Sequence, residues 1–288
     1  MSSGYYAFLV FLGGCSYGIL STIVKTAYGA GLSLSDVAGG QVFWGAVIFW
    51  LAAWKRKPKQ ISLKKTVLLI LSGMPMGMTS IFYYRSLETL DASLAIVFLF
   101  QFVWIGTLFE MVFFKKFPSF QKTVSIIILL IGSAVAAGLR PEGNFEWSPG
   151  IFWGGLSAVS YSLVILASGT AGVDVPPVFK GALMSLGAAF VIFLYLPPLF
   201  LTKYDLFISV LPYGVLLGLF GIVIPPFLFS VGIPRTGPGL GSILTSSELP
   251  AALLTAAFVL KETVDMTRWW GAFLILIGII LGNREHRK

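Results

Sequence analysis

The chain has 288 residues, of which 57% are hydrophobic and only 11% are charged. This composition is far from that of soluble domains and indicates an integral membrane protein. The formal net charge of +8 at pH 7 invites a nucleic-acid partner, but the cations follow membrane topology instead, so we expect none.

Ten apolar segments follow one another along the chain, each close to the roughly 20 residues that a helix needs to cross a bilayer. They cover about residues 5–27, 34–54, 66–86, 92–114, 121–139, 148–168, 178–201, 209–232, 238–260 and 267–283. The first segment lacks a basic start and a cleavage site, so we interpret it as a retained helix. The connections are short, and we therefore expect one transmembrane domain over residues 1–288.

Lysine and arginine are distributed unequally between the two sides that these segments define. With the N-terminus inside, 14 of the 20 fall on the inner side: Lys55, Arg56, Lys57, Lys59, Lys64, Lys65, Lys115, Lys116, Lys122, Lys180, Arg235, Arg284, Arg287 and Lys288. This excess predicts a multi-pass protein of the cell membrane with both termini in the cytoplasm. Anionic lipid headgroups are the expected partners of these cations.

The second half of the chain repeats the first. Matches occur at three offsets: 144 residues for Ser16-Tyr17 and Ser160-Tyr161, 146 for Leu108 with Leu254 and Gly132 with Gly278, and 136 for residues 42–46 with 178–182. The order of the matches predicts two repeats of five helices, about 1–140 and 147–288. Because five is odd, the second repeat enters the membrane from the opposite side. The predicted fold class is an all-α membrane protein of ten transmembrane helices, arranged as two inverted five-helix repeats.

Glu248 is the most informative residue, because it lies near the middle of the ninth apolar segment. A carboxylate at that depth costs about 2.5–3.5 kcal/mol and normally faces a partner or a water-filled cavity. Pro250 lacks an N–H and is expected to bend the helix beside it. Ser247 and its hydroxyl-bearing neighbours can satisfy the freed backbone. Gln101 aligns with Ser247 at the offset of 146, which predicts a polar group at the same depth.

Several aromatic residues lie deep in predicted helices or at repeat-matched positions and are candidates for a cavity wall. These are Tyr17, Trp44, Tyr83, Tyr84, Trp104, Trp153 and Tyr161. Beside a carboxylate, aromatic rings suit an organic cation through cation–π attraction. They equally suit an aromatic amino acid through stacking, and packing alone is the alternative for each.

Hinges are expected where glycine and proline interrupt the apolar segments. Gly237 and Gly239 open the ninth segment, Pro225 and Pro226 break the eighth, and Pro250 lies beside Glu248. Five pairs have the Gly-x-x-x-Gly spacing that lets helices approach closely: 14 and 18, 73 and 77, 214 and 218, 237 and 241, and 278 and 282. We expect them to pack within a monomer, with a weak homodimer as the alternative.

The residue inventory argues against an enzyme. His286 is the only histidine and Cys15 the only cysteine, so no metal site or histidine-based catalytic residue is expected inside the membrane. No nucleotide-binding loop or metalloprotease motif occurs, and no cofactor is expected. Glu110 lies near the inner end of its segment, where it is expected to pair beside Lys115.

The second half carries a sequence pattern that is less specific than a signature motif. It consists of Glu248-Leu249-Pro250, then Leu260-Lys261-Glu262-Thr263, and then Trp270-Gly271 in the last segment. With the paired halves, this pattern resembles the EamA-like ten-helix branch of the drug/metabolite transporter superfamily over essentially the whole chain. The first half departs from it, because Lys116 stands in place of Glu262 and Trp104 in place of Pro250. The resemblance implies a carrier of small organic metabolites or drugs, commonly outward, with a central cavity between the halves.

We interpret the chain as a secondary active transporter of small organic metabolites or amino acids that works by alternating access. Export is the expected direction, and a proton or other gradient acting through Glu248 is the expected driving force. Multidrug or quaternary-amine efflux and facilitative uptake remain alternatives within transport. An intramembrane enzyme and a receptor are the alternatives outside it, but a receptor gives no reason for duplicated halves.

Overall fold

The computed structural model describes residues 3–54, 61–86, 89–90, 92–138, 148–261 and 263–285, and the described residues are helical with no strand. In the first half the helices are α1 (Ser3–Gly29), α2 (Leu34–Ala53), α3 (Leu63–Ser86), α4 (Ala92–Leu99), α5 (Phe102–Phe114) and α6 (Phe120–Ala136). In the second half they are α7 (Pro149–Thr170), α8 (Pro177–Tyr195), the 3₁₀-helix η2 (Leu199–Leu201), α9 (Tyr204–Leu217), the π-helix η3 (Gly218–Val223), α10 (Ile224–Thr236), α11 (Pro238–Thr245), α12 (Glu248–Phe258) and α13 (Met266–Glu285).

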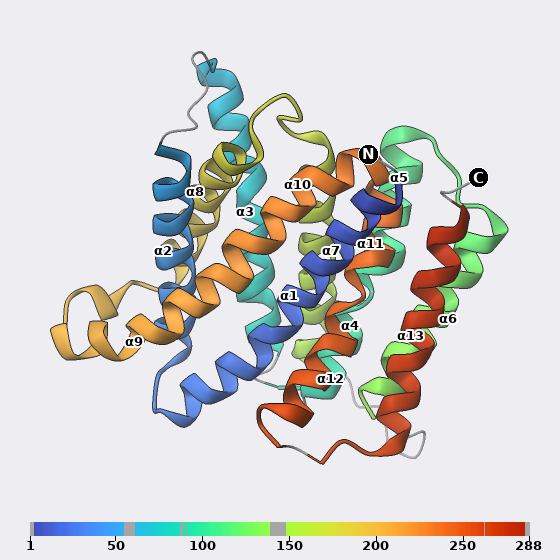
Figure 1. Ribbon diagram of the computed structural model, residues 1–288. Coiled ribbons are helices and arrows are strands. Elements are labelled where there is room, and N and C mark those ends of the chain that lie inside the picture. Colours follow the sequence, from blue (N-terminus) through green and yellow to red (C-terminus); the bar gives the residue numbers. More distant parts are fainter. Residues whose placement is uncertain are drawn as a thin grey trace.

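These helices make ten crossings. Helices α4 and α5 form one crossing, α9, η3 and α10 another, and α11 and α12 a third. Eight helical stretches are long and apolar enough to cross a membrane, α6 is a shorter apolar helix, and the pair α11 and α12 supplies the tenth crossing. The predicted ten-helix architecture is confirmed. Both termini lie on one face, at the top of Figure 1, which we call the termini face.

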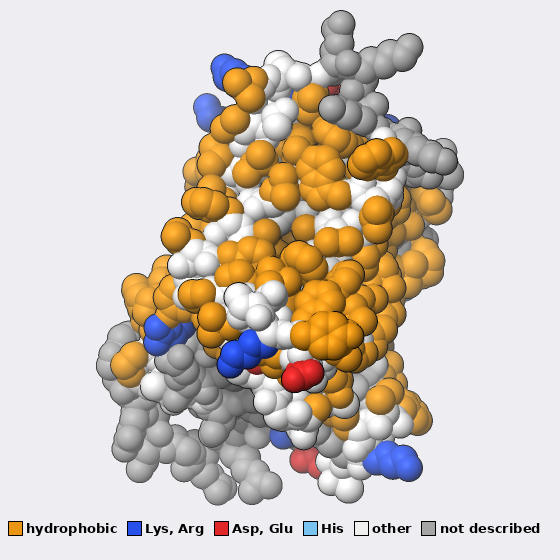
Figure 2. Space-filling view, turned by 90° about the vertical axis from the view of Figure 1, so that its left-hand side faces the viewer, with side chains coloured by type: hydrophobic (Ala, Val, Ile, Leu, Met, Phe, Trp, Pro, Cys, Tyr) orange, Lys and Arg blue, Asp and Glu red, His pale blue; other side chains and the backbone are white. Residues whose placement is uncertain are grey.

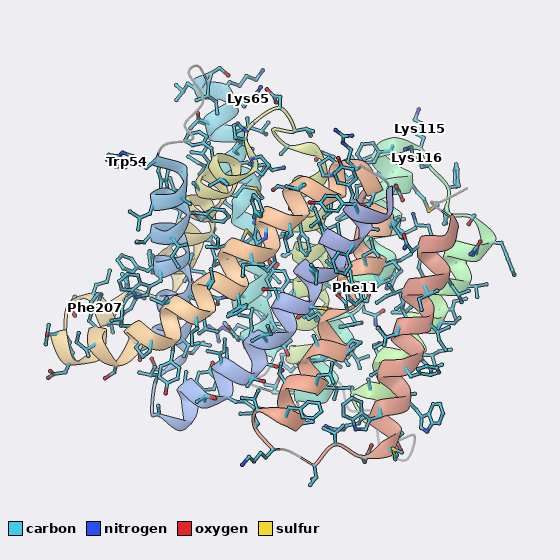
Figure 3. All side chains as sticks on the ribbon, in the orientation of Figure 1. Phe11, Trp54, Lys65, Lys115, Lys116 and Phe207 are labelled. Atoms are coloured by element: carbon cyan, nitrogen blue, oxygen red, sulfur yellow. The ribbon has the colours of Figure 1, made fainter. Side chains whose placement is uncertain are left out.

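The surface has the polarity of a membrane protein. Large hydrophobic side chains are exposed along most helices, and Figure 2 shows them as a band across the middle of one side, with lysine and arginine towards its ends. Lys65, Lys115 and Lys116 lie along the termini face (Figure 3), as the charge distribution predicts. The basic residues Lys55, Arg56, Lys57, Lys59, Arg140, Arg287 and Lys288, like Glu262, lie outside the described residues.

The contacts between helices repeat in the two halves. Helix α3 packs against α7 and α8, and its counterpart, the stretch from α9 to α10, packs against α1 and α2. Helix α7 packs against α4 and α5, and α1 packs against α11 and α12. Two further large contacts join counterparts directly: α2 with α8, and α6 with α13. Apart from the contact between α5 and α11, the pattern therefore maps onto itself when the two repeats are exchanged, which is the symmetry expected of inverted repeats.

Glycines set the closest of these contacts. A Cβ built on Gly73 of α3 would collide with the backbone of Met184 in α8, and one on Gly77 would lie 2.7 Å from the Ala188 carbonyl oxygen. A Cβ on Gly278 of α13 would lie 2.8 Å from Cγ of the Leu129 side chain in α6. These Gly-x-x-x-Gly pairs therefore join helices within one chain.

Lys180 corrects the charge distribution expected from the sequence. We expected it among the solvated cations of the inner side, but its side chain is 1% exposed. Its Nζ donates hydrogen bonds to the carbonyl oxygens of Ser168 (2.7 Å) and Ala167 (3.5 Å), in the last turn of α7. Carbonyls at a helix C-terminus lack intrahelical donors and attract a cation, so the ammonium group caps α7 instead of reaching water.

We predict that Gly73→Ala lowers the melting temperature of the purified protein in detergent, because overpacking a tight contact costs about 1–3 kcal/mol. Gly155→Ala is the matched control, since a Cβ on Gly155 of α7 meets nothing within 4 Å. The control should match the wild type or melt slightly higher, because alanine favours helix. Equal melting temperatures for the two variants would contradict the close α3–α8 packing.

Candidate functional site

Two crossings are broken at the same position of their repeats. Helix α4 ends at Leu99 and α5 begins at Phe102, whereas α11 ends at Thr245 and α12 begins at Glu248. The breaks at residues 100–101 and 246–247 are 146 residues apart, which is the offset expected for this part of the repeats. Gln101 and Ser247 are thus equivalent, and the residue after each of them begins the second half-helix.

The break between α11 and α12 is satisfied by side chains and by a neighbouring helix. Pro250 has no N–H to donate to Ser246, and the Ser246 carbonyl accepts instead from the Leu249 N–H at 3.4 Å. The Thr245 hydroxyl donates to the Gly241 carbonyl at 2.8 Å, and the Ser247 hydroxyl donates to the Phe11 carbonyl of α1 at 2.7 Å. The hydroxyl groups thus lie at the break, but a backbone N–H, and not the hydroxyl that the sequence predicts, satisfies the freed Ser246 carbonyl.

The first repeat reaches the same break without a proline. Trp104 stands at the place of Pro250, and its indole N–H donates to the Gln101 side-chain carbonyl at 2.9 Å. The Gln101 amide N–H in turn donates to the Val97 carbonyl at 2.9 Å. The Gln101 side chain therefore links the two sides of the break in the first repeat. At the equivalent break in the second repeat, several hydroxyls form the side-chain hydrogen bonds instead.

Helices α1 and α7 cover the breaks with small residues. A Cβ on Gly14 would collide with the Ser247 hydroxyl, and one on Gly18 would collide with the Glu248 carbonyl oxygen. At the position equivalent to Gly18, Ser162 of α7 donates a hydrogen bond of 3.2 Å to the Phe102 carbonyl. Each break is therefore pressed against the first helix of a repeat.

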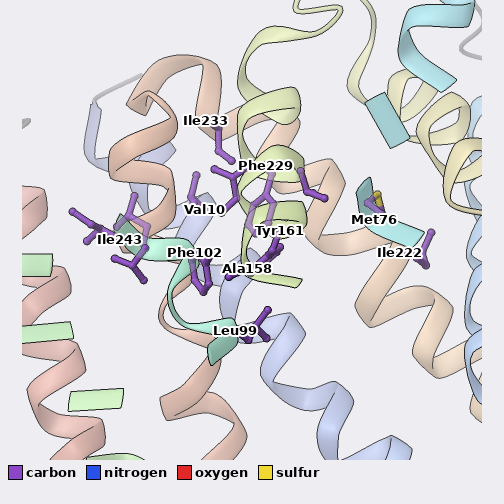
Figure 4. Close-up of a cluster of buried hydrophobic side chains, with 14 of the residues drawn as sticks. Val10, Met76, Leu99, Phe102, Ala158, Tyr161, Ile222, Phe229, Ile233 and Ile243 are labelled. Carbon is purple, nitrogen blue, oxygen red and sulfur yellow. The ribbon is translucent and has the colours of Figure 1, made fainter. Parts of the chain in front are cut away.

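Glu248 is surrounded by tyrosines, which we call the tyrosine cluster: Tyr17 of α1, Tyr83 of α3 and Tyr161 of α7. The Tyr161 hydroxyl donates a hydrogen bond of 3.4 Å to Oε2 of Glu248, and the other two interact with this carboxylate electrostatically. The rings of Tyr17 and Tyr161 meet edge to face at 5.7 Å. Tyr161 also packs against Phe102 at 4.7 Å, beside Phe229 in Figure 4.

Glu248 and its aromatic neighbours are not completely enclosed. Glu248, Tyr17, Tyr83 and Tyr84 are half-buried, although they lie among helices, whereas Ser247 is fully buried. The hydrogen bond from Ser247 to Phe11 places the break about a third of the way along α1, and Figure 3 labels Phe11 near the middle depth of the molecule. Glu248 thus lies near the middle depth of the molecule and keeps some accessible surface, an arrangement compatible with an acid that faces a cavity.

The structure brings together some of the predicted wall residues and separates others. Tyr84 neighbours Tyr83, with ring centres 6.2 Å apart, and interacts with Tyr28 at the end of α1. Trp44 lies apart, against Phe43 and Phe207 on the α9 side, because glycine at position 214 leaves room for its indole.

Trp104, a predicted wall residue, is 42% exposed, and its indole bonds to Gln101 at the break. Two other contributors to the site, Phe102 and Phe229, were not predicted as wall residues. The offset of 146 was the available signal for Phe102, because it makes this residue the counterpart of Glu248.

Irregular backbone marks the predicted hinges. Pro225 and Pro226 directly follow the π-helix η3, and the Ser16 hydroxyl donates to the Phe220 carbonyl there at 2.8 Å. Proline provides no N–H to this stretch, so Ser16 replaces a missing donor. Gly237 joins α10 to α11 with φ of +82°, a conformation that favours glycine.

Glu110 corrects a further expectation. It is buried near the end of α5 and forms an ion pair with Lys122 of α6 rather than with Lys115. Its carboxylate also lies against Gly239, where a Cβ would collide with it. Lys115 turns away because it has a left-handed conformation, with φ of 54°, at the end of α5.

The two ends of the broken crossings differ in packing. On the termini face, α5 packs against α11, and a Cβ on Gly106 would lie 2.9 Å from the Ser242 Cβ. Among the described residues, α4 and α12 show no comparable packing. The half-helices therefore meet on the termini face and separate on the opposite face.

No group of three or more His, Cys, Asp or Glu side chains that could hold a metal ion occurs in the described part of the chain. The site consists of one carboxylate, neutral hydroxyls and aromatic rings. These groups can bind a cation, a proton or a polar organic molecule.

Comparisons with known proteins give a family and a fold. The model of the EamA-like transporter family matches twice, over residues 4–138 and 148–284. Among the solved structures, 29 chains match, including one titled "Crystal structure of protein" with a TM-score of 0.77 and 15% sequence identity. The alignment covers 100% of this chain and 100% of that one, and at this identity it shows the fold. No curated protein matches the chain.

We predict that Ser247→Ala lowers the free energy of unfolding by about 0.5–1.5 kcal/mol, because it removes the hydrogen bond that joins the break to α1. Ser72→Ala is the matched control, since that hydroxyl lies at the surface and bonds only within α3. Denaturant or thermal unfolding of the purified variants measures both. A control variant as unstable as Ser247→Ala would refute a special role for this hydrogen bond.

Proposed function

The chain belongs to the EamA-like transporter family, and we propose that it is a secondary active exporter of small organic solutes that works by alternating access. The observation that carries this proposal is the single carboxylate of Glu248, at mid-depth, half-buried and next to the break in its helix. A buried acid with access to a cavity is expensive, so it is expected to bind or release something during the cycle.

The arrangement of the half-helices supports a state that is closed on the termini face and open on the opposite face. We take the termini face to be cytoplasmic, as the positions of Lys65, Lys115 and Lys116 suggest. The contact between α5 and α11 then forms the inner gate, and the space between α4 and α12 is the route from Glu248 to the outside.

The inner gate is closed by both packing and charge. Gly106 of α5 fits against Ser242 of α11 without room for a Cβ. The Glu110 carboxylate lies beside Gly239 at the start of α11 and is paired with Lys122 of α6. Removal of one partner of a buried ion pair lowers the stability of a protein by about 3–5 kcal/mol. This pair can therefore hold α5, α6 and the start of α11 together.

The inverted repeats provide the second state. Exchanging the conformations of the two repeats would bring α4 against α12 and separate α5 from α11, which closes the outer route and opens the inner gate. Gly237, Pro225 and Pro250 lie where the backbone is already irregular, so small changes there can change the angle between half-helices. The π-helix η3 would be a third such joint.

The Glu248 carboxylate favours gradient-coupled transport over facilitative uptake. A facilitator for neutral metabolites has no need of an ionisable group in its pathway, whereas a coupled carrier requires one that is charged in one half of the cycle and neutralised in the other. Metabolites and amino acids fit the mixture of aromatic and hydroxyl groups around Glu248.

We predict that Glu248→Gln abolishes solute flux driven by a proton gradient in proteoliposomes while the protein remains folded. Glutamine keeps the shape and can still accept from Tyr161, but it cannot change charge. Asp174→Asn is the matched control, because this carboxylate lies exposed in a loop and pairs with Lys65. Undiminished, pH-dependent flux in Glu248→Gln would rule out this coupling mechanism.

We also predict that a disulfide between Gly106→Cys and Ser242→Cys, in a Cys15→Ala background, stops flux under oxidising conditions and releases it on reduction. The side chains would be close enough to cross-link with a small shift. A second pair, Ser125→Cys with Gly282→Cys, joins α6 to α13 away from the gate and should leave flux unchanged. Continued flux through the cross-linked α5–α11 pair would exclude this gate.

A further inference from the structure

We propose that the ion pair between Glu110 and Lys122 is a one-sided latch. It stabilises the state that is closed on the termini face, and the chain cannot form the equivalent pair on the opposite face. The pair therefore sets the ratio between the two states of the carrier. This inference rests on the proposed function, because it assumes the two conformations of alternating access.

The pair lies inside the protein, at the closed gate. The side chains of Glu110 and Lys122 are only 10% and 14% exposed, and the ammonium group donates a hydrogen bond to Oε2 of the carboxylate. Glu110 lies near the end of α5, and Lys122 lies in the first turn of α6. Charges with so little contact with water depend strongly on the groups around them, because few water molecules can replace a lost partner.

The pair also packs directly against the start of α11. A Cβ on Gly239 would collide with both Oε2 of Glu110 and Nζ of Lys122, and one on Gly237 would lie 3.0 Å from Oε1 of Glu110. The pair thus occupies the place that a side chain at position 239 would take. The negative charge also lies at the N-terminal end of α11, where the helix dipole favours it.

Opening of the inner gate would remove α11 from this pair. Glu110 and Lys122 lie on helices that follow one another in the chain, so they would stay together, but they would lose the first turn of α11. The contact with Gly239 therefore stabilises the closed gate alone. An interaction that is present in one of two states shifts the equilibrium towards that state by its full free energy.

The packing of α6 against α13 shows which residues are equivalent in the two repeats. These helices lie side by side in Figure 1. A Cβ on Gly132 would lie 3.1 Å from the Gly271 carbonyl oxygen, and one on Gly278 would lie 3.3 Å from the Ser125 carbonyl oxygen. The two contacts are exchanged by the offset of 146, so this offset holds for α6 and α13 as it does for the broken crossings.

The equivalent positions on the opposite face lack the carboxylate. The offset of 146 places Ala256 of α12 at the position of Glu110, and Arg268 of α13 at the position of Lys122. The cation is kept, but a methyl group replaces the acid. The Arg268 guanidinium lies against the end of α6 instead, where a Cβ on Gly138 would be 3.0 Å from its Nε. A second latch between α12 and α13 therefore cannot form.

This asymmetry favours one resting state. Without solute, the carrier would rest with the inner gate closed and with the route to Glu248 open on the opposite face. Glu110 and Lys122 are positioning residues in this role, because they act through the place of α11 and not by contact with the solute.

The test measures how often the inner gate opens, by labelling of a buried thiol in the full-length protein in detergent. Ser242→Cys in a Cys15→Ala background places this gate thiol on α11, where Ser242 is fully buried. Glu110→Gln should speed the reaction of the gate thiol with a water-soluble maleimide at least about tenfold, which corresponds to about 1.4 kcal/mol in the gate equilibrium.

A second variant covers the case in which Glu110→Gln does not fold, since it leaves a buried ammonium group without its partner. Glu110→Gln combined with Lys122→Met removes both charges, a change that proteins often tolerate. It should label the gate thiol as fast as Glu110→Gln does. Asp174→Asn is the matched control, because it breaks an exposed pair with Lys65 and should stay within about threefold of the wild type.

The missing acid can also be supplied on the opposite face. Ala256→Glu places a carboxylate at the position from which Arg268 would be paired, so it should favour closure of that face. The gate thiol should then label about threefold faster, as expected for a partly exposed pair. Ala256→Gln has the same size without the charge and should label as the wild type does.

General loss of structure is distinguished by a second thiol. Ser185→Cys, in the same Cys15→Ala background, lies in α8, where Ser185 is 1% exposed. It should label slowly in every variant. Equal acceleration of both thiols in the two Glu110 variants would overturn the latch, because the pair would then support the whole fold and not the gate.

Labelling of the gate thiol at the wild-type rate in both Glu110 variants would also overturn the latch. That result would leave the transporter function standing as long as flux depended on Glu248. Faster labelling of the gate thiol alone, in a protein that shows no solute flux, would support the latch and refute the proposed function.

Discussion

A helix that breaks inside a membrane must find partners for its backbone within the protein, because lipid offers none. This constraint explains the centre of the molecule. The Ser247 hydroxyl donates to the Phe11 carbonyl of α1, and the Ser162 hydroxyl of α7 donates to the Phe102 carbonyl. Gly18 has no side chain, so α1 can lie against the Glu248 carbonyl. Both breaks are thereby pressed between a first helix and the opposite repeat, so the acid after one of them is held at a defined depth.

The two repeats keep this backbone arrangement but differ in chemistry. Phe102 and Glu248 occupy equivalent positions after their breaks, and Tyr161 touches both. In the proposed cycle the symmetric backbone would provide two related conformations, whereas the single carboxylate would provide one group for binding and coupling. The Phe102 ring supports the tyrosine that holds the carboxylate, which makes the difference between the repeats part of the site.

The ten crossings and the inverted repeats were predictable, because apolar length and an odd helix number are direct consequences of residue order. Glu248 was predictable for the same reason, since a carboxylate stands out in an apolar segment. The offset of 146 also predicted that Gln101 and Ser247 share one depth. What the sequence did not predict depends on how side chains turn in three dimensions. The segment 92–114 was taken as continuous, because no proline marks its break, and the Gln101 side chain that stabilises the break is an ordinary residue in sequence.

The environments of two long cationic side chains were also predicted incorrectly. Lys180 lies within the first turn of α8, and its flexible stem lets the ammonium group reach the carbonyls that end α7. Lys122 similarly reaches across to Glu110. In both cases a count of charges by side of the membrane gave the correct face but the wrong environment, because a lysine can satisfy its charge inside the protein when a helix end or a carboxylate is within reach.

The solitary acid has an energetic consequence for the proposed cycle. One carboxylate holds at most one proton, so it could return no more than one proton in each turnover, and the membrane voltage would contribute at most about 2.3 kcal/mol per 100 mV to each turnover. Phe102 stands at the equivalent position of the first repeat, so the two breaks supply one ionisable group between them and not two.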